Sequence, residues 1–427
     1  MKFIFADSLD YVDPRYDFLA DRSPPGREPY WDDKFPHEIL GHAPYDGILV
    51  SRGIADRRMS SAKYTEAQAR RFRTVGGREF LRFREADFPG SLLFGDCGAF
   101  AYHKEKVPPY TPEDMIEFYE DGGFTHGCSV DHIIFEFDPN AGTAQGGSAE
   151  ARERFDITLD NADRFLKAAK RLGNRFVPMG VVQGWSPASM AEAARRLQAM
   201  GYDYLALGGM VPLKAPEIHQ CLRAIREAIG PGIRLHVLGF AKADQIHEFA
   251  GYGIASFDTT SPLIRSFTDA KANYYLQGPD DRLRYFTAIR IPQALENPKL
   301  MRGVKSGALS AEELQALERA ALLALRGFDK GECGIDEALE AILAYSVSME
   351  HAETEVARGK KLGALRARYR ESLAQKPWKQ CSCSICSAIS VEVMVFRASN
   401  RNKRRGIHNL EIFGRHVHAL RELDEHA

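Results

Sequence analysis

From its first residues to Asp258, the chain alternates between two patterns of hydrophobic and polar positions. Short apolar runs of strand length are followed by longer segments in which apolar side chains return every three or four positions. The runs predict strands at 2–5, 47–51, 92–96, 130–137, 175–184, 202–209, 234–240 and 254–258. Helices are predicted between them at 65–73, 111–119, 150–172, 186–200, 215–229 and 242–252.

Strands that alternate with helices at this spacing indicate a parallel sheet with crossover helices. The number of units favours a closed (β/α)₈ barrel, the TIM barrel, over an open doubly wound sheet. No Gly-x-Gly-x-x-Gly follows the first strands, which argues against a dinucleotide-binding fold. After Pro292 the pattern is helical, with one helix beginning at Ser310 and others at 335–345 and 361–373. We therefore expect an α/β protein with a barrel at 1–295 and a helical extension at 296–376.

Polar or glycine residues recur where the predicted strands end. In a (β/α)₈ barrel, the carboxyl ends of the strands carry the chemistry. The residues at these ends are Asp96, Asp131, Gln183, Gly208, Gly209, His236 and Asp258. Asp258 follows an apolar run, and an acid in that place serves as a nucleophile or a general base. The alternative is that Asp258 caps the N-terminus of a helix.

Composition narrows the class of protein. The chain has 427 residues, of which 44% are hydrophobic and 27% charged, as is typical of a soluble globular protein. No apolar run is long enough to span a bilayer, and charge interrupts the first residues too soon for a signal peptide. We therefore expect a cytoplasmic protein without a membrane partner. Seven cysteines, three of them within six residues, do not resemble a disulfide framework.

The charge of the chain is unevenly distributed. The net charge is −1, but thirteen Lys or Arg and two Glu give the segment from Ala357 to His408 a net charge of +11 and leave −12 for the rest. Such asymmetry indicates that this end of the chain meets a polyanion. For 358–370 alone the alternative is a solvated helix face, but the basic residues continue to Arg405.

Three thiols, those of Cys381, Cys383 and Cys386, lie in one short loop. A fourth metal ligand is available in His408, His416 or His418. Three thiolates and one imidazole form a common closed set for structural Zn²⁺. We therefore expect a zinc-binding subdomain with a C-terminal helix at 377–427, with buried or reactive cysteines as the alternative. The basic residues at 401–405 lie inside the loop that the metal would close, so we expect them to contact phosphates.

A second group of histidines lies near the N-terminus. His37-Glu-Ile-Leu-Gly-His42 is similar to a zinc-protease motif, but its histidines are five apart and do not share a helix face. We interpret them as a structural or surface pair.

Several motifs in the same order resemble the tRNA-guanine transglycosylase superfamily, whose members have a (β/α)₈ barrel with a zinc-binding insertion. Gly95-Asp-Cys-Gly-Ala-Phe100 resembles the family's Asp-Ser-Gly-Gly-Phe, and Gln183-Gly184 resembles its Gln-Gly-Gly. Leu207-Gly-Gly-Met210 resembles its Gly-Gly-Leu, and Phe257-Asp258 resembles its Phe-Asp nucleophile segment. The Cys-x-Cys-x-x-Cys motif and Ile407-His408-Asn409 complete the zinc set. The resemblance runs from Phe94 to His408.

The resemblance implies a role for each matched residue. Asp258 would be the nucleophile that attacks the sugar C1′ and displaces guanine, and Asp96 the general acid/base. Two carboxylates split one displacement into two easier steps through a covalent enzyme–nucleic acid intermediate. The purine edge would be recognised by Asp131, Gln183, Gly208 and Gly209, with Met210 or Tyr102 as an apolar wall and Glu136 and Asp138 as alternatives to Asp131. The resemblance also makes His408 the fourth zinc ligand.

Departures from the family pattern bear on the substrate. Ala99 and Trp185 replace family glycines, and Thr259-Thr-Ser-Pro-Leu-Ile-Arg265 replaces the basic signature that follows the nucleophile in the tRNA enzymes. The chain is most similar to the DNA-modifying branch, which implies a pentosyltransferase that replaces guanine in DNA by a 7-deazaguanine precursor, preQ0 in preference to preQ1. The partners would be double-stranded DNA, the free 7-deazaguanine base and partner proteins of a DNA-modification system.

Two competing hypotheses remain. One is a tRNA-guanine transglycosylase that acts on tRNA. The other is a non-catalytic nucleic-acid-binding subunit that keeps the fold, against which the retention of both Asp96 and Asp258 argues.

Overall fold

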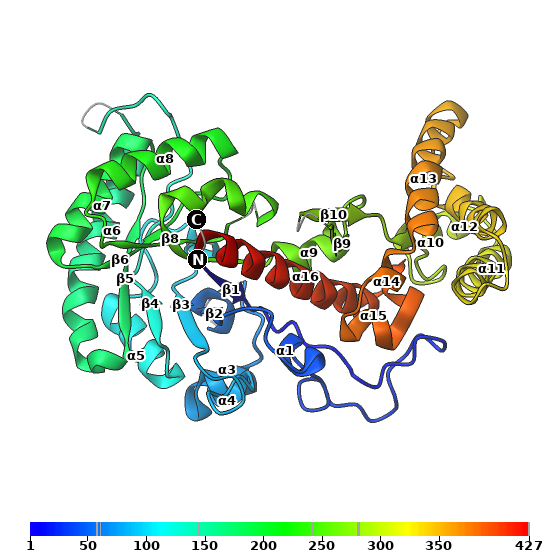
Figure 1. Ribbon diagram of the computed structural model, residues 1–427, viewed down its shortest axis with the longest axis horizontal. Coiled ribbons are helices and arrows are strands. Elements are labelled where there is room, and N and C mark those ends of the chain that lie inside the picture. Colours follow the sequence, from blue (N-terminus) through cyan, green and yellow to red (C-terminus); the bar gives the residue numbers. More distant parts are fainter. Residues whose placement is uncertain (57–58, 60, 144–145, 241–242, 280–281, 426–427) are drawn as a thin grey trace. The chain divides into compact units, whose positions relative to one another are not determined.

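The chain forms two compact units (Figure 1), seen in a computed structural model that describes residues 1–56, 59, 61–143, 146–240, 243–279 and 282–425. Unit 1 consists of Met1–Asp10, Tyr45–Ser261 and Leu420–Ala427, and unit 2 of Tyr11–Pro44 and Pro262–Ala419. The expected division into 1–295, 296–376 and 377–427 follows the order of the chain. Both compact units are assembled from segments that are distant in sequence.

Unit 1 is built around a closed barrel of eight parallel strands, so the expected (β/α)₈ barrel is confirmed. The strands are β1 (Lys2–Ala6), β2 (Gly47–Ser51), β3 (Leu92–Asp96), β4 (His126–Cys128), β5 (Val177–Val182), β6 (Tyr204–Leu207), β7 (Arg234–Val237) and β8 (Ile254–Thr259). Pairing of β1 with β8 closes the barrel and sets Phe3 opposite Phe257, whose rings stack 5.6 Å apart. Because all strands are parallel, their carboxyl ends meet at one rim.

The barrel interior is a packed apolar core. Side chains alternate between the two faces of each strand, and a buried cluster of apolar and aromatic ones fills the interior. The buried members of this core are Ile4, Leu49, Phe94, Cys128, Met179, Val181, Tyr204 and Ala206. Full burial of each large apolar side chain stabilises the fold by roughly 1.5–3 kcal/mol, so the core holds the strand ends in fixed positions.

Helices connect the barrel strands (Figure 1). They are α2 (Arg52–Ala55), α3 (Glu66–Val75), α4 (Gly77–Phe80), α5 (Pro112–Gly122), α6 (Ala149–Ala169), α7 (Pro187–Met200), α8 (Ala215–Ala228) and 3₁₀ helices at Ala99–Tyr102, Lys170–Arg175 and Ala243–Tyr252. The start of α7 is as expected, because the Ser186 hydroxyl accepts from the Ser189 backbone N–H and Pro187 occupies the first turn. Lys242, the first residue of the expected helix at 242–252, lies outside the described residues.

The predicted strand at 130–137 is wrong. The fourth strand is β4, the three residues His126–Cys128, and 130–137 is irregular, with 130–134 buried. The apolar run reflects burial alone, because these side chains are buried without their backbone joining the ladder. The correction places Asp131 just beyond the carboxyl end of β4.

Unit 2 is mostly helical. Its elements are α1 (Pro36–Leu40), α9 (Ser261–Thr268, beginning at the last residue of a unit 1 segment), β9 (Tyr274–Gln277), β10 (Leu283–Phe286), β11 (Ile289–Arg290), α10 (Pro298–Lys305), α11 (Ala311–Lys330), α12 (Ile335–Met349), α13 (Glu355–Gln375), α14 (Pro377–Gln380), α15 (Ser384–Ile389), β12 (Val395–Phe396) and α16 (Ser399–Glu425, whose last residues belong to unit 1). The helices predicted at Ser310, 335–345 and 361–373 correspond to α11, α12 and α13.

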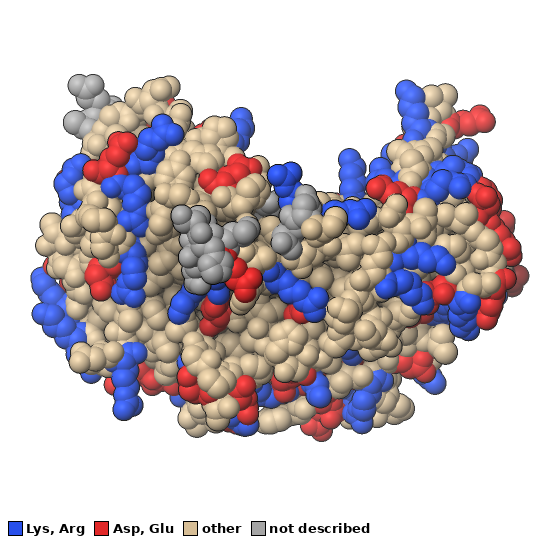
Figure 2. All heavy atoms as spheres, in the orientation of Figure 1, with Lys and Arg blue, Asp and Glu red and all other residues tan. Residues whose placement is uncertain are grey.

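Three of the basic residues near the start of α16 are buried and cannot form a phosphate-contacting surface, so the expectation is wrong for these three. Arg401, Arg404 and Arg405 are buried. Arg401 binds Asp21 and Glu392, and Arg405 donates to the backbone carbonyls of Val393 and Val395. Buried guanidinium groups need such partners because an unpaired buried charge is costly. On the face drawn in Figure 2, Lys and Arg side chains are interspersed with Asp and Glu side chains.

The two histidines of the zinc-protease-like motif have separate environments, in agreement with a structural or surface pair. His37 is buried and stacks on Phe35 at 5.8 Å between ring centroids. His42 is half exposed and its Nε2 lies 2.7 Å from Glu411 Oε2. No helix in the described part of the chain is long and apolar enough to cross a membrane.

Candidate active site and metal centre

The carboxyl rim of the barrel brings together the polar residues expected there. Asp96 ends β3, Asp131 follows β4, Gln183 follows β5, Gly208 and Gly209 follow β6, His236 lies on β7 and Asp258 on β8. Six successive strands therefore present a polar side chain or a bare glycine backbone to one rim.

Asp258 is held by groups from the loop and strand beside it. Its Oδ1 accepts from the Gly239 backbone N–H at 3.0 Å and lies 3.1 Å from His236 Nε2. The chain of contacts continues inward, because His236 Nδ1 is 2.5 Å from the Ser256 hydroxyl, which is 2.6 Å from the Tyr204 hydroxyl. Asp258 makes no capping bond to a helix among the described residues, which removes the N-cap alternative. Asp258 is 5% exposed, and its carboxylate is held at one oxygen.

Asp96 is a carboxyl group in an apolar and negatively charged setting. Burial, together with the charges of Asp258 and Asp131, raises its pKa to about 7, although a hydrogen bond with Ser51 and one from the Gly98 backbone act in the opposite direction. Its Oδ1 is buried and has no hydrogen-bond partner among the described residues. Gly98 is required in the turn, since its φ is +76° and an added Cβ would lie 2.7 Å from the Ser51 hydroxyl.

The raised pKa of Asp96 makes stability depend on pH. The folded protein keeps this proton to about pH 7, whereas the unfolded chain loses it near 3.8, so the folded state binds more protons between these values. The free energy of unfolding therefore falls as pH rises through that window. We expect Asp96→Asn to be more stable than wild type at pH 8, by on the order of a few kcal/mol, and to lose this advantage towards pH 4.

Urea unfolding of both proteins at pH 5 and pH 8 measures this difference. Asp156→Asn is the matched control, because that carboxylate is exposed on α6. If the stability difference between Asp96→Asn and wild type is no larger at pH 8 than at pH 5, the raised pKa is contradicted.

Asp131 and Gln183 form a buried hydrogen-bonded pair. Gln183 Nε2 donates to Asp131 Oδ2 at 2.7 Å, and the Cys97 thiol donates to Asp131 Oδ1 at 3.0 Å. The Tyr102 hydroxyl lies 2.8 Å from Cys97 Sγ and 2.9 Å from the Asp131 carbonyl oxygen. Burial raises the pKa of Asp131, and the Cys97 and Gln183 bonds oppose that shift. The two polar groups are thus oriented before any ligand arrives.

The glycines after β6 leave room for this pair. A Cβ on Gly208 would lie 2.3 Å from Gln183 Nε2, so a larger residue there would displace the amide. Gly209 has a φ of +72°, which favours glycine, and Met210 beside it is 2% exposed. Sequence and structure agree that bare backbone lies next to Gln183.

Three other residues weighed from the sequence lie away from the buried pair. Glu136 and Asp138 are exposed, and their carboxylates accept from the backbone N–H groups of Ser148 and Asn140. Trp185 is 3% exposed and packs on Phe155 at 5.4 Å between ring centroids. Trp185 is therefore a core residue.

Sequence reasoning left two features of this rim without a role. His236 was noted only as a polar strand end, although a histidine between buried Leu235 and Val237 was a signal that it faces the interior. Phe100 and Phe135 are 53% and 45% exposed, and their rings lie 5.8 Å apart. The contact between these two residues could not be predicted from the sequence, because they are distant in the chain and meet only in the folded barrel.

A second cluster of functional side chains lies in unit 2. The thiols of Cys381, Cys383 and Cys386 and one imidazole nitrogen of His408 all lie within 4.8 Å of one another and are buried. His408 Nδ1 is 3.6, 3.3 and 3.4 Å from the three sulfur atoms in turn. Among the histidines weighed as fourth ligand, His408 belongs to this group, and His416 and His418 do not. These four donors are close enough to hold one metal ion.

The metal group is braced by its surroundings. His408 Nε2 lies 2.7 Å from the Tyr275 carbonyl oxygen, which fixes Nδ1 towards the thiols. The Tyr274 ring stacks on His408 at 4.1 Å, and its hydroxyl is 3.2 Å from Cys386 Sγ. The four donors therefore come from α16 and the loop around α15, with β9 supplying the support.

Comparison with known proteins gives two relatives, while no family model matches the chain. A DNA-guanine transglycosylase of Salmonella montevideo is 38% identical over 414 residues, which cover 96% of this chain and 95% of that protein. A queuine tRNA-ribosyltransferase of Psychrobacter sp. (strain PRwf-1) is 27% identical over 139 residues, 31% of this chain and 34% of that protein. The first similarity therefore extends over nearly the whole of both chains.

Proposed function

Since the chain belongs to the DNA-guanine transglycosylase family and is a pentosyltransferase, we propose that it replaces guanine in DNA by a 7-deazaguanine base, preQ0, through a covalent intermediate on Asp258. The observation that carries this proposal is 38% identity over 96% of the chain to a protein of that name. The three carboxylates gathered at one barrel rim support the chemistry. A tRNA substrate is the alternative, favoured only by the shorter and weaker second similarity.

Asp258 acts as the nucleophile in this mechanism. One carboxylate oxygen forms a bond to the sugar C1′ while the bond from C1′ to guanine N9 breaks and its electron pair leaves on the base. The Gly239 N–H and His236 hold Oδ1, which supports attack by the other oxygen, Oδ2. The product of this half-reaction is an ester between Asp258 and the DNA, with guanine released.

Asp96 moves the proton in both half-reactions. Its pKa of about 7 leaves both protonation states populated near neutral pH, as a group that first gives and then takes a proton requires. In the first half-reaction it protonates the departing guanine. In the second it takes the N9 proton of the incoming base, whose nitrogen then displaces Asp258 from C1′. Atoms and charges balance, and no oxidant or reductant is needed.

Asp131 and Gln183 recognise the base. A carboxylate accepts from the purine N1–H and exocyclic amine, and an amide supplies both a donor and an acceptor. Their mutual hydrogen bond supports a site prepared in advance, because the side chains need little reorganisation. Gly209 lets the backbone approach the ring closely, and Met210 forms an apolar wall. preQ0 shares this edge with guanine, which suits an exchange between the two.

The metal at the cysteine cluster is Zn²⁺ in a structural role. Three thiolates and one imidazole are the donors that zinc prefers, and four protein ligands complete a tetrahedral site. Bound zinc would cross-link α16 to the loop around α15, with no position left for a substrate. The support of His408 by the Tyr275 carbonyl agrees with a permanent site.

Nucleoside mass spectrometry tests the proposed substrate. DNA and tRNA are purified from the same cells, which express the protein together with its genomic neighbours and a source of preQ0. The proposal expects a 7-deazaguanine deoxynucleoside in digested DNA and none when Asp258→Ala replaces wild type. Deazapurine found only in tRNA would overturn the DNA proposal and establish the alternative.

A further inference from the structure

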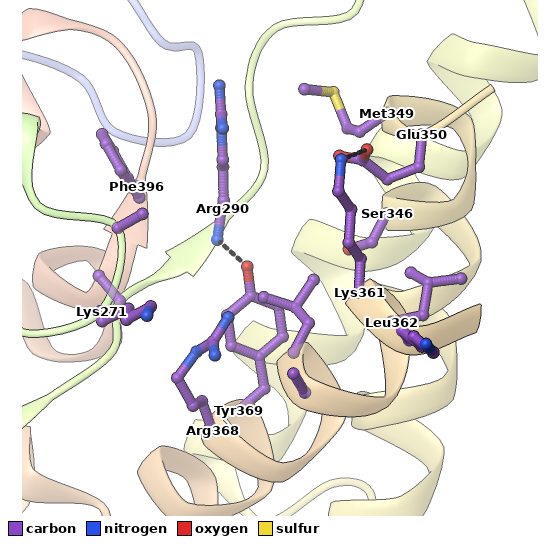
Figure 3. Close-up of a pocket in the computed structure, with 15 residues that line it drawn as sticks. Lys271, Arg290, Ser346, Met349, Glu350, Lys361, Leu362, Arg368, Tyr369 and Phe396 are labelled. Atoms are coloured by element: carbon purple, nitrogen blue, oxygen red, sulfur yellow. Dashed lines mark hydrogen bonds and ion pairs between the residues drawn. The ribbon is translucent and has the colours of Figure 1, made fainter. Parts of the chain in front are cut away.

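Unit 2 contains a pocket of about 490 Å³ among α12, α13 and β11 (Figure 3). It is lined by residues between Ala270 and Phe396, and all of these belong to unit 2. In Figure 3, Arg290 stands between Phe396 on one side and Met349 on the other, with Arg368 below. None of these residues belongs to the barrel rim or the cysteine cluster.

The charge of the pocket is strongly positive. Five cationic side chains line it against one carboxylate: Lys271, Arg290, Lys360, Lys361 and Arg368 against Glu350. Lys361 and Lys299 both bind Glu350, with N–O distances of 3.2 and 3.4 Å, so that carboxylate is already neutralised. Among the described residues, the other four cations have no carboxylate partner.

The two faces of α13 differ in how their cations are paired. Lys360 and Arg368 line the pocket eight residues apart, which places them on one face of the helix with Ala364 between them. Arg366 and Arg370 instead bind Glu340 and Asp336 of α12. Lys360 and Arg368 therefore differ from Arg366 and Arg370 in having no carboxylate partner among the described residues. In Figure 2, Lys and Arg side chains are visible around α13.

The lining between the cations is largely apolar and aromatic. Tyr369 is buried in its floor, where its hydroxyl accepts from the Arg290 backbone N–H at 2.9 Å. Burial raises the pKa of this hydroxyl to about 12, and the charges of Arg290 and Arg368 act in the opposite direction. Arg290 also lies over the Phe396 ring at 5.9 Å from its centroid. A ligand for this pocket carries anionic groups beside a flat or apolar body, as a nucleotide does.

We propose that this pocket binds a phosphodiester of the DNA substrate, with the adjoining sugar and base on the apolar lining. The proposal rests on the proposed function, because it takes DNA as the polyanion. Four unpaired cations repel one another, and phosphate groups relieve that repulsion. Guanidinium groups suit phosphate oxygens because they donate in a planar fork.

The test compares two double variants, each of which lacks two cations of α13. The pocket variant combines Lys360→Ala with Arg368→Ala, and the matched control combines Arg366→Ala with Arg370→Ala. Affinity for a fluorescent DNA duplex is measured by anisotropy across a salt series. We expect the slope of log affinity against log salt to fall by about 0.9 for the pocket variant, because the pocket neutralises one phosphodiester and each neutralised phosphate adds about 0.9 to that slope. The control is expected to keep the wild-type slope.

Three further readouts keep the result interpretable. Zinc content and thermal unfolding show whether each variant is folded. A second pocket variant, Lys360→Gln with Arg368→Gln, keeps most of the side-chain volume and is expected to reduce the slope by the same amount. An unchanged slope in a folded pocket variant overturns the proposal. A slope that changes for tRNA but not for DNA overturns it as well.

The outcome separates this proposal from the proposed function. If the wild-type protein incorporates labelled base into DNA while the pocket variant has the wild-type slope of log DNA affinity against log salt, only the pocket proposal fails. If wild type labels only tRNA, both proposals fail.

Discussion

Asp258→Ala is expected to lower the rate of base exchange by about a thousand-fold or more and to remove the covalent adduct. A nucleophile that is replaced by a methyl group leaves no atom to form the bond to C1′, and rate reductions of this size accompany removal of a catalytic nucleophile. The barrel should remain folded, because the neighbouring His236 keeps its hydrogen bond to Ser256. Incorporation of a radiolabelled base into DNA by purified protein measures the rate.

Asp203→Ala is the matched control for this measurement. Asp203 directly precedes β6 and therefore lies at the amino end of the barrel, where its side chain is exposed and paired with Arg234. The control should keep exchange near the wild-type rate. An Asp258→Ala enzyme that still incorporates labelled base would exclude Asp258 as the nucleophile.

Cys383→Ser is expected to lose its zinc and with it the folded state of unit 2. Binding of structural zinc is worth about 10–16 kcal/mol in zinc-finger peptides, more than the typical stability of a domain. Cys383 is 2% exposed, and its Sγ also accepts from the Cys386 backbone N–H at 3.4 Å, so the substitution disturbs both the metal and the start of α15. Elemental analysis measures the zinc content, and limited proteolysis measures the folded state of unit 2.

Cys333→Ser provides the control for the zinc measurement. Cys333 also belongs to unit 2, but its thiol donates to the Ala324 carbonyl oxygen and it is not a member of the cysteine cluster. It should retain about one zinc per chain and resist protease as wild type does. Full zinc content in Cys383→Ser would refute the assignment of the metal ligands.

The barrel was predictable because local patterns along the chain specify it. Short apolar runs and three- to four-residue periodicity alternate, and chain connectivity then leaves few topologies. The pattern failed at 130–137, where buried apolar residues lie in irregular backbone. Periodicity reports burial, and it does not tell whether a buried segment hydrogen-bonds to a neighbouring strand.

The rim of the barrel was predictable only in part. Each acid could be placed at a strand end, but its partners come from other strands. His236 reaches Asp258, and Cys97 reaches Asp131, only after the barrel has closed. The raised pKa of Asp96 likewise depends on burial and on two acids distant in the sequence. Such properties belong to the tertiary fold.

The basic C-terminal segment shows why charge alone misleads. The sequence counts Arg401 and Arg405 towards a surface for phosphates, but both are buried and bound to groups from other parts of unit 2. A buried, paired guanidinium group can be distinguished from a free one only when the positions of its hydrogen-bond partners are known. On α13 the same count includes Arg366, which binds Glu340, and Lys360 and Arg368, which have no carboxylate partner among the described residues.

The central claim is that DNA becomes covalently attached to Asp258 during base exchange. Denaturing the protein during turnover with a labelled DNA duplex, and in parallel with labelled tRNA, traps whatever ester is present. After nuclease and protease digestion, mass spectrometry of the peptide that contains Asp258 identifies the attached sugar. We expect a deoxyribose adduct on Asp258 from the DNA reaction and none from Asp258→Ala. A ribose adduct from tRNA alone, or a deoxyribose adduct on a different residue, would contradict the account.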